Sequence, residues 1–196
     1  INNLNDVAPV FTSSTLYYAD ENQTSIGEVT ATDVDSSSLA YSVTGSNFRI
    51  TADGTLTFVS APDHETKASF IGSVTVTDGN LSTTQPITVV VNNLNDNTPV
   101  ITSLNNFSVD ENKTTIGTVT VTDADGNLNQ LTFSVSGSEL AITSAGVLTF
   151  ATAPDYETKS SYTATVTATD SVNSITQDIT ISITNLNDNY PILDTT

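Results

Sequence analysis

The feature that most constrains this chain is an internal repeat of about ninety residues. A phrase rich in Asn and Asp that contains or ends in Pro occurs three times, at 2–9, 92–99 and 185–191, and its central Asp positions are 90 and 92 residues apart. That period is the length of a small domain, large enough to bury a core of its own. The sequence therefore predicts two tandem repeats. The predicted divisions are 1–97, 98–189 and a tail or next-repeat start at 190–196.

Within each repeat, β-branched and aromatic residues alternate with polar ones at a period of two, which is typical of β-strands. Corresponding runs in the two repeats are 25–32 and 115–122, 39–43 and 131–135, 48–50 and 140–142, 56–59 and 147–150, 70–77 and 162–169, and 87–91 and 179–183. Gly-containing turns at 52–55 and 144–146 indicate hairpins. With a strand near each Asn-rich phrase, we expect about seven short antiparallel strands in each repeat. The predicted fold is all-β: two tandem seven-stranded Greek-key β-sandwiches of immunoglobulin-like architecture in an elongated arrangement.

The charge balance narrows the partners of this chain. It has 22 acidic side chains against four basic ones, a net charge of −18, and no cysteine. Such a chain repels nucleic acid and anionic membrane surfaces, because both are bound through clustered Lys and Arg. No apolar run approaches the ~20 residues of a membrane-spanning helix, so we expect no membrane insertion. The chain opens inside a repeat without a signal peptide, and we therefore expect it to be part of a longer protein.

The acidic residues recur at equivalent positions of the two repeats. The recurring groups are Asp20-Glu21 with Asp110-Glu111, Asp33 and Asp35 with Asp123 and Asp125, Asp63 and Glu65 with Asp155 and Glu157, and Asp78 with Asp170. Carboxylates two positions apart lie on one side of an extended backbone and repel each other unless a cation lies between them. Ca²⁺ takes six to eight oxygen ligands, whereas zinc prefers His and Cys and Mg²⁺ retains waters. The pattern therefore favours Ca²⁺.

In combination, these motifs resemble tandem cadherin repeats over nearly the whole chain. They comprise a Glu near the repeat start, Asp-x-Asp, Pro-Asp-x-Glu, Thr-Asp near the end of the penultimate strand, and Leu-Asn-Asp-Asn-x-Pro at 94–99. The resemblance implies three calcium ions at the junction 92–99. The implied ligands of the first ion are Glu21, Asp63, Glu65 and Asp96. Those of the second are Glu21, Glu65, Asp96, Asp125 and the Leu94 carbonyl. Those of the third are Asn95, Asp123, Asp125, Asp170 and the Asn97 carbonyl.

The resemblance also implies half a site at each outer edge. The N-terminal half-site comprises Asn5, Asp33, Asp35 and Asp78. The C-terminal half-site comprises Glu111, Asp155, Glu157 and Asp188. The chain departs from the family at Asn93, where the family has Asp, and at Val7, where the other phrases have Asn97 and Asn189. Trp is absent, so the strand exchange of animal cadherins, which buries a Trp in a partner, is not open to this chain.

The resemblance implies a calcium-dependent adhesion and structural module that is extracellular, at the cell surface or secreted. Its expected partners are neighbouring cadherin-like repeats of the same chain and a cell-surface or polysaccharide ligand. The cysteine-free composition, rich in Thr, Ser and Asn, is similar to repeats of large bacterial surface adhesins. The alternative is a carbohydrate-binding module that stacks sugar rings on Tyr17, Tyr18 or Tyr190.

Catalysis is not predicted. Asp63 and Glu65 could form the carboxylate pair of a glycosidase, with His64 as a base. The pair recurs at Asp155 and Glu157 with Tyr156 between them, however, and catalytic centres seldom repeat with the fold.

Overall fold

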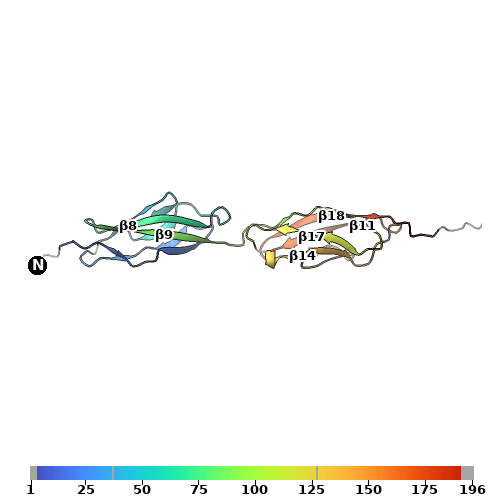
Figure 1. Cartoon of the computed structure of the whole chain (residues 1–196), viewed down its shortest axis with the longest axis horizontal. Coiled ribbons are helices and arrows are strands. Elements are labelled where there is room, and N and C mark those ends of the chain that lie inside the picture. Colours follow the sequence, from blue (N-terminus) through green and yellow to red (C-terminus); the bar gives the residue numbers. More distant parts are fainter. Residues whose placement is uncertain (1–3, 37, 127, 191–196) are drawn as a thin grey trace, which may run out of the picture. The chain divides into compact units, whose positions relative to one another are not determined.

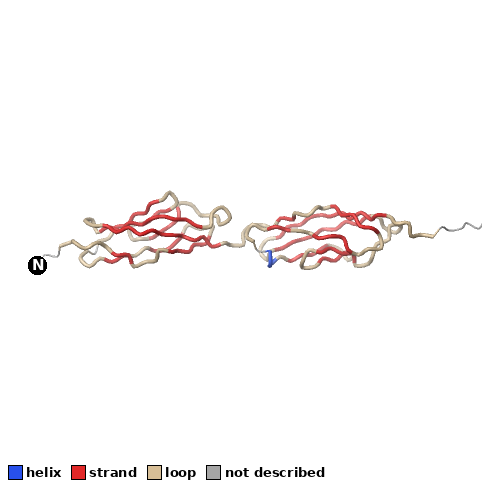
Figure 2. The backbone as a smooth tube through the Cα atoms, in the orientation of Figure 1, coloured by secondary structure: helices blue, strands red, loops and turns tan. Residues whose placement is uncertain are grey.

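The computed structural model describes residues 4–36, 38–126 and 128–190. The chain separates into two compact units, Ile1–Leu94 and Asn95–Thr196, so that the unit boundary lies inside the phrase 92–99. Figure 1 shows the course of the chain through each unit, and Figure 2 shows the strands of both units in red, joined by loops and turns in tan. Asn2 and Asn3 of the first phrase, and the predicted tail from residue 191 onward, lie outside the described residues.

Unit 1 is a sandwich of two main sheets. Its strands are β1 (Val10–Phe11), β2 (Leu16–Asp20), β3 (Ser25–Glu28), β4 (Ala31–Thr32), β5 (Ala40–Thr44), β6 (Phe48–Ile50), β7 (Thr55–Phe58), β8 (Ser69–Thr77) and β9 (Ser82–Asn92). One sheet has the order β2-β9-β8-β5 and the other β3-β7-β6, while β1 and β4 form a short ribbon. The long hairpin β8–β9 is labelled in Figure 1.

Unit 2 repeats this topology. Its strands are β10 (Val100–Ile101), β11 (Asn106–Asp110), β12 (Thr115–Thr118), β13 (Val121–Thr122), β14 (Thr132–Val135), β15 (Leu140–Ile142), β16 (Val147–Phe150), β17 (Ser161–Thr169) and β18 (Ser174–Thr184). The sheets are β11-β18-β17-β14, β12-β16-β15 and the ribbon β10-β13. A 3₁₀ turn, η1 (Leu128–Gln130), lies in the loop where repeat two is longer. The all-β prediction is confirmed, and no helix in the described part is long and apolar enough to cross a membrane.

The predicted number of seven strands per repeat is not confirmed, because two predicted strands are each divided. Unit 1 has nine segments, β1 to β9. The predicted strand 25–32 splits because β3 pairs with β7 while β4 pairs with β1. At the break, the Val29 N–H donates to the Gly54 carbonyl at 2.9 Å. The first strand divides in the same way, with β1 pairing with β4 and β2 crossing to β9.

The prediction of an entirely antiparallel pattern is wrong for one strand pair in each unit. β2 runs parallel to β9, with Leu16 opposite Thr88, and β11 runs parallel to β18, with Asn106 opposite Thr180. The parallel pair arises because the first strand changes sheets part-way along, and its second half then lies beside the last strand. Alternation within a strand reports burial, not the direction of its neighbour.

The core of each unit consists of the inward-facing residues of the two sheets. In unit 1 these include Val74 on β8 and Ile87, Val89 and Val91 on β9. In unit 2 they include Val166 on β17 and a row of isoleucines on β18. Because every second residue faces inward, the loops at the strand ends can carry polar residues without disturbing this core.

The predicted hairpin turns are present, and both require glycine. Gly54 and Gly146 have φ angles of 93° and 76°. A Cβ at either position would overlap a backbone carbonyl oxygen, of Val29 and Val119 respectively. Val29 and Val119 in turn donate their N–H groups to the carbonyls of Gly54 and Gly146. The turn is therefore fixed by close packing as well as by its left-handed conformation.

Candidate metal centre

The recurring acids lie in loops at strand ends and form two kinds of cluster in each unit. We define the Asp-x-Asp clusters as Asn5, Asp33, Asp35 and Asp78 in unit 1 and Asn95, Asp123, Asp125 and Asp170 in unit 2. We define the buried-Glu clusters as Glu21, Asp63 and Glu65 in unit 1 and Glu111, Asp155 and Glu157 in unit 2. In each Asp-x-Asp cluster, the paired aspartates follow the short strand β4 or β13, and the third follows the long strand β8 or β17.

In the Asp-x-Asp cluster of unit 1, oxygen atoms of Asp33, Asp35 and Asp78 lie within 4.8 Å of one another. The Asn5 amide reaches Asp35 Oδ1 and Asp78 Oδ2 at 3.2 and 3.0 Å. With its nitrogen facing them, the amide donates one hydrogen bond to each of these carboxylates. Asp33 Oδ2 is buried without a hydrogen-bond partner. The donor set is made of oxygens, which suits Ca²⁺.

In the Asp-x-Asp cluster of unit 2, three buried oxygens have no hydrogen-bond partner: Asn95 Oδ1, Asp123 Oδ2 and Asp170 Oδ2. Asp170 is fully buried and Asp125 is 8 % exposed. Leaving a buried acceptor unsatisfied is costly, and native structures contain few such atoms. Three of them in one cluster of carboxylate and amide groups fit a hard cation. All three residues were predicted as ligands of the third ion.

Two carboxyl groups of this cluster are shifted in opposite directions. Burial, together with the charges of Asp125 and Asp170, raises the pKa of Asp123 even though the Asp125 N–H donates to its Oδ1. Burial also acts to raise the pKa of Asp170, but hydrogen bonds from the Asn173 and Val172 N–H groups outweigh it and hold that pKa below its ordinary value. The raised pKa of Asp123 reflects burial and also the neighbouring carboxylates of Asp125 and Asp170, and a bound cation would relieve the repulsion among them.

Asp125 has partners in Asn97. The Asn97 N–H donates to Asp125 Oδ2 at 2.9 Å, and the side-chain amide donates to Asp125 Oδ1 at 2.7 Å. The same amide lies 3.0 Å from Asp96 Oδ1. The Asn97 carbonyl, a predicted ligand, accepts the Asn173 amide at 3.1 Å. The sequence reasoning did not identify Asn173; only its place in the turn after Asp170 could have suggested it.

The buried-Glu cluster of unit 2 has oxygen atoms of Glu111, Asp155 and Glu157 within 4.8 Å of one another. Glu111 is 1 % exposed, and its carboxylate accepts the Tyr156 N–H at 2.9 Å and the Leu186 N–H at 2.7 Å. A hydrogen bond from the Thr158 hydroxyl lowers the pKa of Asp155, although burial acts in the opposite direction. Glu111 therefore ties two loops together as well as offering a ligand.

Unit 1 repeats these contacts. Glu21 is 2 % exposed and accepts the His64 N–H and the Leu94 N–H, both at 2.7 Å. The Thr66 hydroxyl donates to Asp63 at 2.8 Å and lowers the pKa of its carboxyl group. The recurrence of the same network in both units indicates a role that belongs to the repeat.

Asn22 and Asn112, which follow the buried glutamates, are residues whose role the sequence did not reveal. They adopt left-handed φ angles of 63° and 65°. Their N–H groups donate at 2.9 Å to Pro62 and Pro154, which turns the chain back over the glutamate. Asn112 also donates to Asp188 Oδ2 at 2.7 Å. The signal was an Asn after the Glu in both repeats, since Asn tolerates this conformation better than most residues.

The tyrosines of the carbohydrate alternative differ in environment. Tyr17 packs against the core of unit 1, and its hydroxyl donates to the Glu28 carbonyl. Tyr18 is 61 % exposed and Tyr190 is 93 % exposed. Tyr18 is therefore the tyrosine of unit 1 whose ring is open to a ligand.

Residues 105–184, within unit 2, match the family model of the cadherin domain. No curated protein sequence matches the chain.

Several solved structures share the fold of the chain. Human protocadherin-24 EC1-2 is 21 % identical with a TM-score of 0.79, covering 92 % of this chain and 99 % of that one. Mouse cadherin-23 EC22-24 is 24 % identical with a TM-score of 0.75, covering 93 % and 66 %. Protocadherin gamma B2 extracellular cadherin domains 3-6 are 25 % identical with a TM-score of 0.76, covering 95 % and 53 %. The chain therefore has the fold of tandem cadherin domains.

Proposed function

We propose that the chain is a calcium-dependent, extracellular adhesion and structural module in which about three Ca²⁺ ions rigidify the junction 92–99 between two cadherin-like repeats. The observation that carries this proposal is the set of three partnerless buried oxygens on Asn95, Asp123 and Asp170. The cadherin fold and the family match of residues 105–184 support it.

The proposed ligand sets are those that the resemblance implies. Glu21, Asp63, Glu65 and the Leu94 carbonyl would contribute from unit 1. Asn95, Asp96, the Asn97 carbonyl, Asp123, Asp125 and Asp170 would contribute from unit 2. The outer half-sites, which include Asn5 at one edge and Asp188 at the other, would take calcium more weakly unless a neighbouring repeat completes them.

The mechanism is linkage between calcium binding and junction order. Without a cation, the carboxylates that flank 92–99 repel one another and the junction is free to swing. Bound Ca²⁺ converts the same carboxylates into cross-links. Extracellular modules bind Ca²⁺ with dissociation constants of about 10⁻⁴–10⁻³ M, which suits a site kept loaded outside the cell. The neighbouring repeats of the same chain are the primary partners, and the cysteine-free composition supports a bacterial surface adhesin as the parent protein.

The direct test is calcium stoichiometry by native mass spectrometry and calorimetry on the whole chain. We expect about three tight ions and weaker ones at the half-sites. Asp125→Asn should reduce the tight set, because Asp125 belongs to two implied ligand sets. Asp178→Asn is the matched control, since Asp178 is exposed on β18, accepts the Thr165 hydroxyl and belongs to none of the implied ligand sets. Tight binding that is unchanged in Asp125→Asn would refute the proposed site.

A second candidate function is carbohydrate binding on the β2-β9-β8-β5 sheet of unit 1. Tyr18 (61 % exposed) lies there near Leu16 (43 %) and Ile71 (78 %), with Leu16 and Ile71 both opposite Thr88. The equivalent face of unit 2 has Ser108 in place of Tyr18. Tyr18→Ala should abolish binding to a glycan array, with Ser108→Ala as the control. A wild-type chain that binds no glycan would eliminate this candidate.

A further inference from the structure

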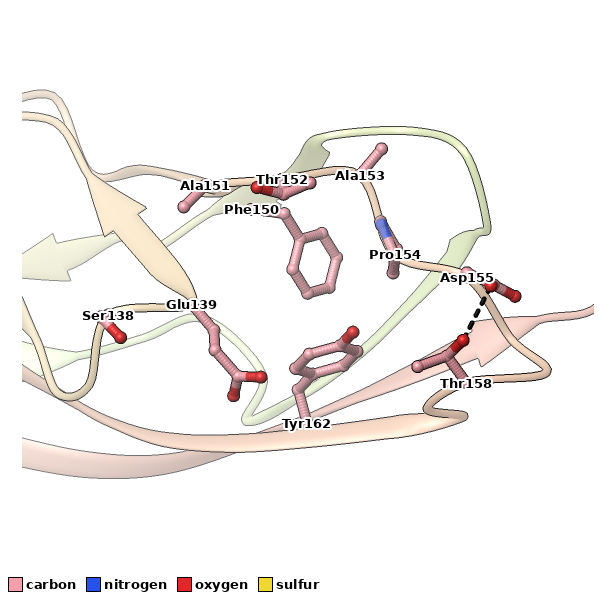
Figure 3. Close-up of a pocket in the computed structure, with 10 residues that line it drawn as sticks. All are labelled: Ser138, Glu139, Phe150, Ala151, Thr152, Ala153, Pro154, Asp155, Thr158 and Tyr162. Carbon is pink, nitrogen blue, oxygen red and sulfur yellow. Dashed lines mark hydrogen bonds between the residues drawn. The ribbon is translucent and has the colours of Figure 1, made fainter.

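Two pockets occupy equivalent positions in the two units. In unit 2 the pocket lies between Glu139, the segment 150–155 and Tyr162, as Figure 3 shows. In unit 1 it lies between Asn47, the segment 58–63 and Phe70. The backbone is arranged in the same way in both units. The Asn47 carbonyl accepts the Val59 N–H just after β7, and the Glu139 carbonyl accepts the Ala151 N–H just after β16, each at 2.8 Å. The two side chains therefore start from the same point at the rim of the pocket.

Both pockets have an aromatic floor. In unit 2, the rings of Phe150 and Tyr162 meet edge to face at 4.9 Å between centroids. In unit 1, Phe58 and Phe70 meet in the same way at 5.1 Å. A buried proline, Pro62 in unit 1, lines the wall beside the rings. Phe58 and Phe150 are buried, so the half-buried rings of Phe70 and Tyr162 supply the apolar surface that a ligand can reach.

A lysine lies over each floor. Lys159 Nζ is 4.2 Å from the centroid of Tyr162, and Lys67 Nζ is 4.5 Å from that of Phe70. Both lysines occupy the same turn, since each donates its N–H to the carbonyl of the aspartate four residues earlier, at 2.9 Å. Two of the four basic side chains of the chain are thus found at these pockets.

The two lysines differ in their counter-ion. Lys159 Nζ lies 2.7 Å from both carboxylate oxygens of Glu139, whose side chain extends toward the Tyr162 ring in Figure 3. Unit 1 has the neutral Asn47 at that position. Within residues 4–36, 38–126 and 128–190, no carboxylate oxygen lies within ion-pair distance of Lys67 Nζ. Unit 2 therefore supplies its own carboxylate, and unit 1 leaves the equivalent position open.

We propose that the unit 1 pocket, at Lys67, binds the carboxylate of a hexuronic acid residue in an otherwise neutral polysaccharide, because the net charge of −18 repels a polyanion. Glu139 in unit 2 shows that a carboxylate fits against the lysine in this frame. The C–H face of a sugar ring would pack against Phe70, which is half-buried, while Phe58 belongs to the core beneath it. Asn47 and Thr66, which line the same pocket, would contact the sugar hydroxyls. The site does not depend on the proposed calcium function.

The test exchanges the rim residues between the units and counts sites by NMR titration of the whole chain in calcium-saturated buffer. The probe is D-galacturonic acid, with galactose as the neutral control. Wild type should bind one equivalent, at Lys67, about tenfold or more tighter than galactose, as expected for a hydrogen bond to a charged group. Asn47→Glu should close the site, and Glu139→Asn should open a second one at Lys159.

Two further variants separate this site from general charge effects. Lys67→Met should weaken galacturonate binding about tenfold or more. Lys113→Met should not, because Lys113 is already paired with Asp110 at 2.7 Å. The proposal is overturned if galacturonate binds no better than galactose, if Asn47→Glu binds like wild type, or if Glu139→Asn gains no site. If N-acetylglutamate amide binds as tightly as galacturonate, the ligand of this pocket is an acidic peptide and not a sugar.

Discussion

The Asp-x-Asp clusters of units 1 and 2 contain the same three carboxylates and the same leading Asn, yet their polar atoms are satisfied differently. In unit 1, the carboxylates converge, the Asn5 amide lies among them, and one buried oxygen, Asp33 Oδ2, lacks a partner. In unit 2, Asn97 supplies a second amide that holds Asp125, and three buried oxygens of the cluster lack partners. The clusters differ at Val7, where unit 2 has Asn97, and in the turn 79–81, where unit 2 has 171–173.

This difference indicates that the residues that would bind the metal and the residues that hold them in place can vary independently between repeats. Asn97 holds one proposed ligand, Asp125, through two hydrogen bonds, and a bound cation would compete with the side-chain one. The other oxygens of the unit 2 cluster gain nothing from that amide and depend more on a cation. Unit 2 should therefore respond more strongly to calcium removal than the half-site of unit 1.

The largest expected effect is on the stability of unit 2, where Glu111 acts as a structural support and Glu157 is only a proposed ligand. Glu111→Ala should destabilise unit 2 by about 3 kcal/mol or more even in chelator, because two backbone N–H groups lose a charged acceptor worth about 1.5–3 kcal/mol each. Glu157→Ala, at an exposed proposed ligand of the same cluster, should change stability in chelator by less than about 1 kcal/mol. Denaturant unfolding followed by circular dichroism measures both. Equal losses for the two variants would contradict the assigned support role.

Calcium itself should give the next largest effect. At free calcium 100-fold above the dissociation constant, one site adds about 2.7 kcal/mol to the free energy of unfolding. Asp170→Asn should remove most of this gain in unit 2, while its Oδ1 can still accept the Val172 and Asn173 N–H groups. Asp78→Asn is the matched change in unit 1 and should cost less. Hydrogen exchange measured by mass spectrometry reports the stability of each unit separately. Equal losses of calcium-dependent stability in the two variants would contradict the difference between the units.

Exchanging Val7 and Asn97 tests the comparison directly. Asn97→Val should tighten calcium binding at the unit 2 cluster by about threefold to tenfold, because Asp125 no longer exchanges an amide hydrogen bond for the metal. The reciprocal Val7→Asn should weaken binding at the unit 1 half-site. Isothermal titration calorimetry measures both changes. Weaker calcium binding in Asn97→Val would show that the amide positions the ligand instead of competing for it.

The smallest expected effect is a pH dependence in chelator. Because the pKa of Asp123 is raised in the folded chain, its contribution to stability is present below the ordinary Asp pKa and is lost as pH rises through the folded value. Asp123→Asn should therefore raise the midpoint of unfolding in chelator at neutral pH, and the difference should vanish in acid. In calcium the order should reverse, since the variant lacks a ligand. Thermal unfolding midpoints measured across pH test both trends. If Asp123→Asn is no more stable than wild type in chelator at neutral pH, repulsion of Asp123 by Asp125 and Asp170 does not destabilise the fold.

Much of the fold could be predicted because the repeat and the period of two are local signals. The strands Phe48–Ile50, Leu140–Ile142 and Val147–Phe150 lie where the pattern places them. The division of the first two strands and the parallel pairing of β2 with β9 could not be predicted. Both depend on which distant strand a backbone group meets, and the side chains of a strand do not record its neighbour.

In the site, too, the residues that recur in the sequence could be predicted, whereas those whose role depends on distant neighbours could not. The paired acids were visible because Asp-x-Asp and Asp-x-Glu recur, and the structure brings Asp33, Asp35 and Asp78 together as expected. The supporting amides of Asn97 and Asn173 were missed as supports, because Asn is frequent throughout the chain and its role depends on three-dimensional neighbours. The calcium ligand sets themselves remain a prediction.

Small-angle X-ray scattering of the whole chain, in calcium and in chelator, tests the central claim most directly. If Ca²⁺ orders the junction 92–99, calcium should narrow the distribution of maximum dimensions, and Asp96→Ala should keep the broad distribution in calcium while circular dichroism shows both sandwiches folded. Acidification should act like the chelator, because protonated carboxylates do not ligate. Identical scattering in calcium and chelator would contradict a calcium-rigidified junction.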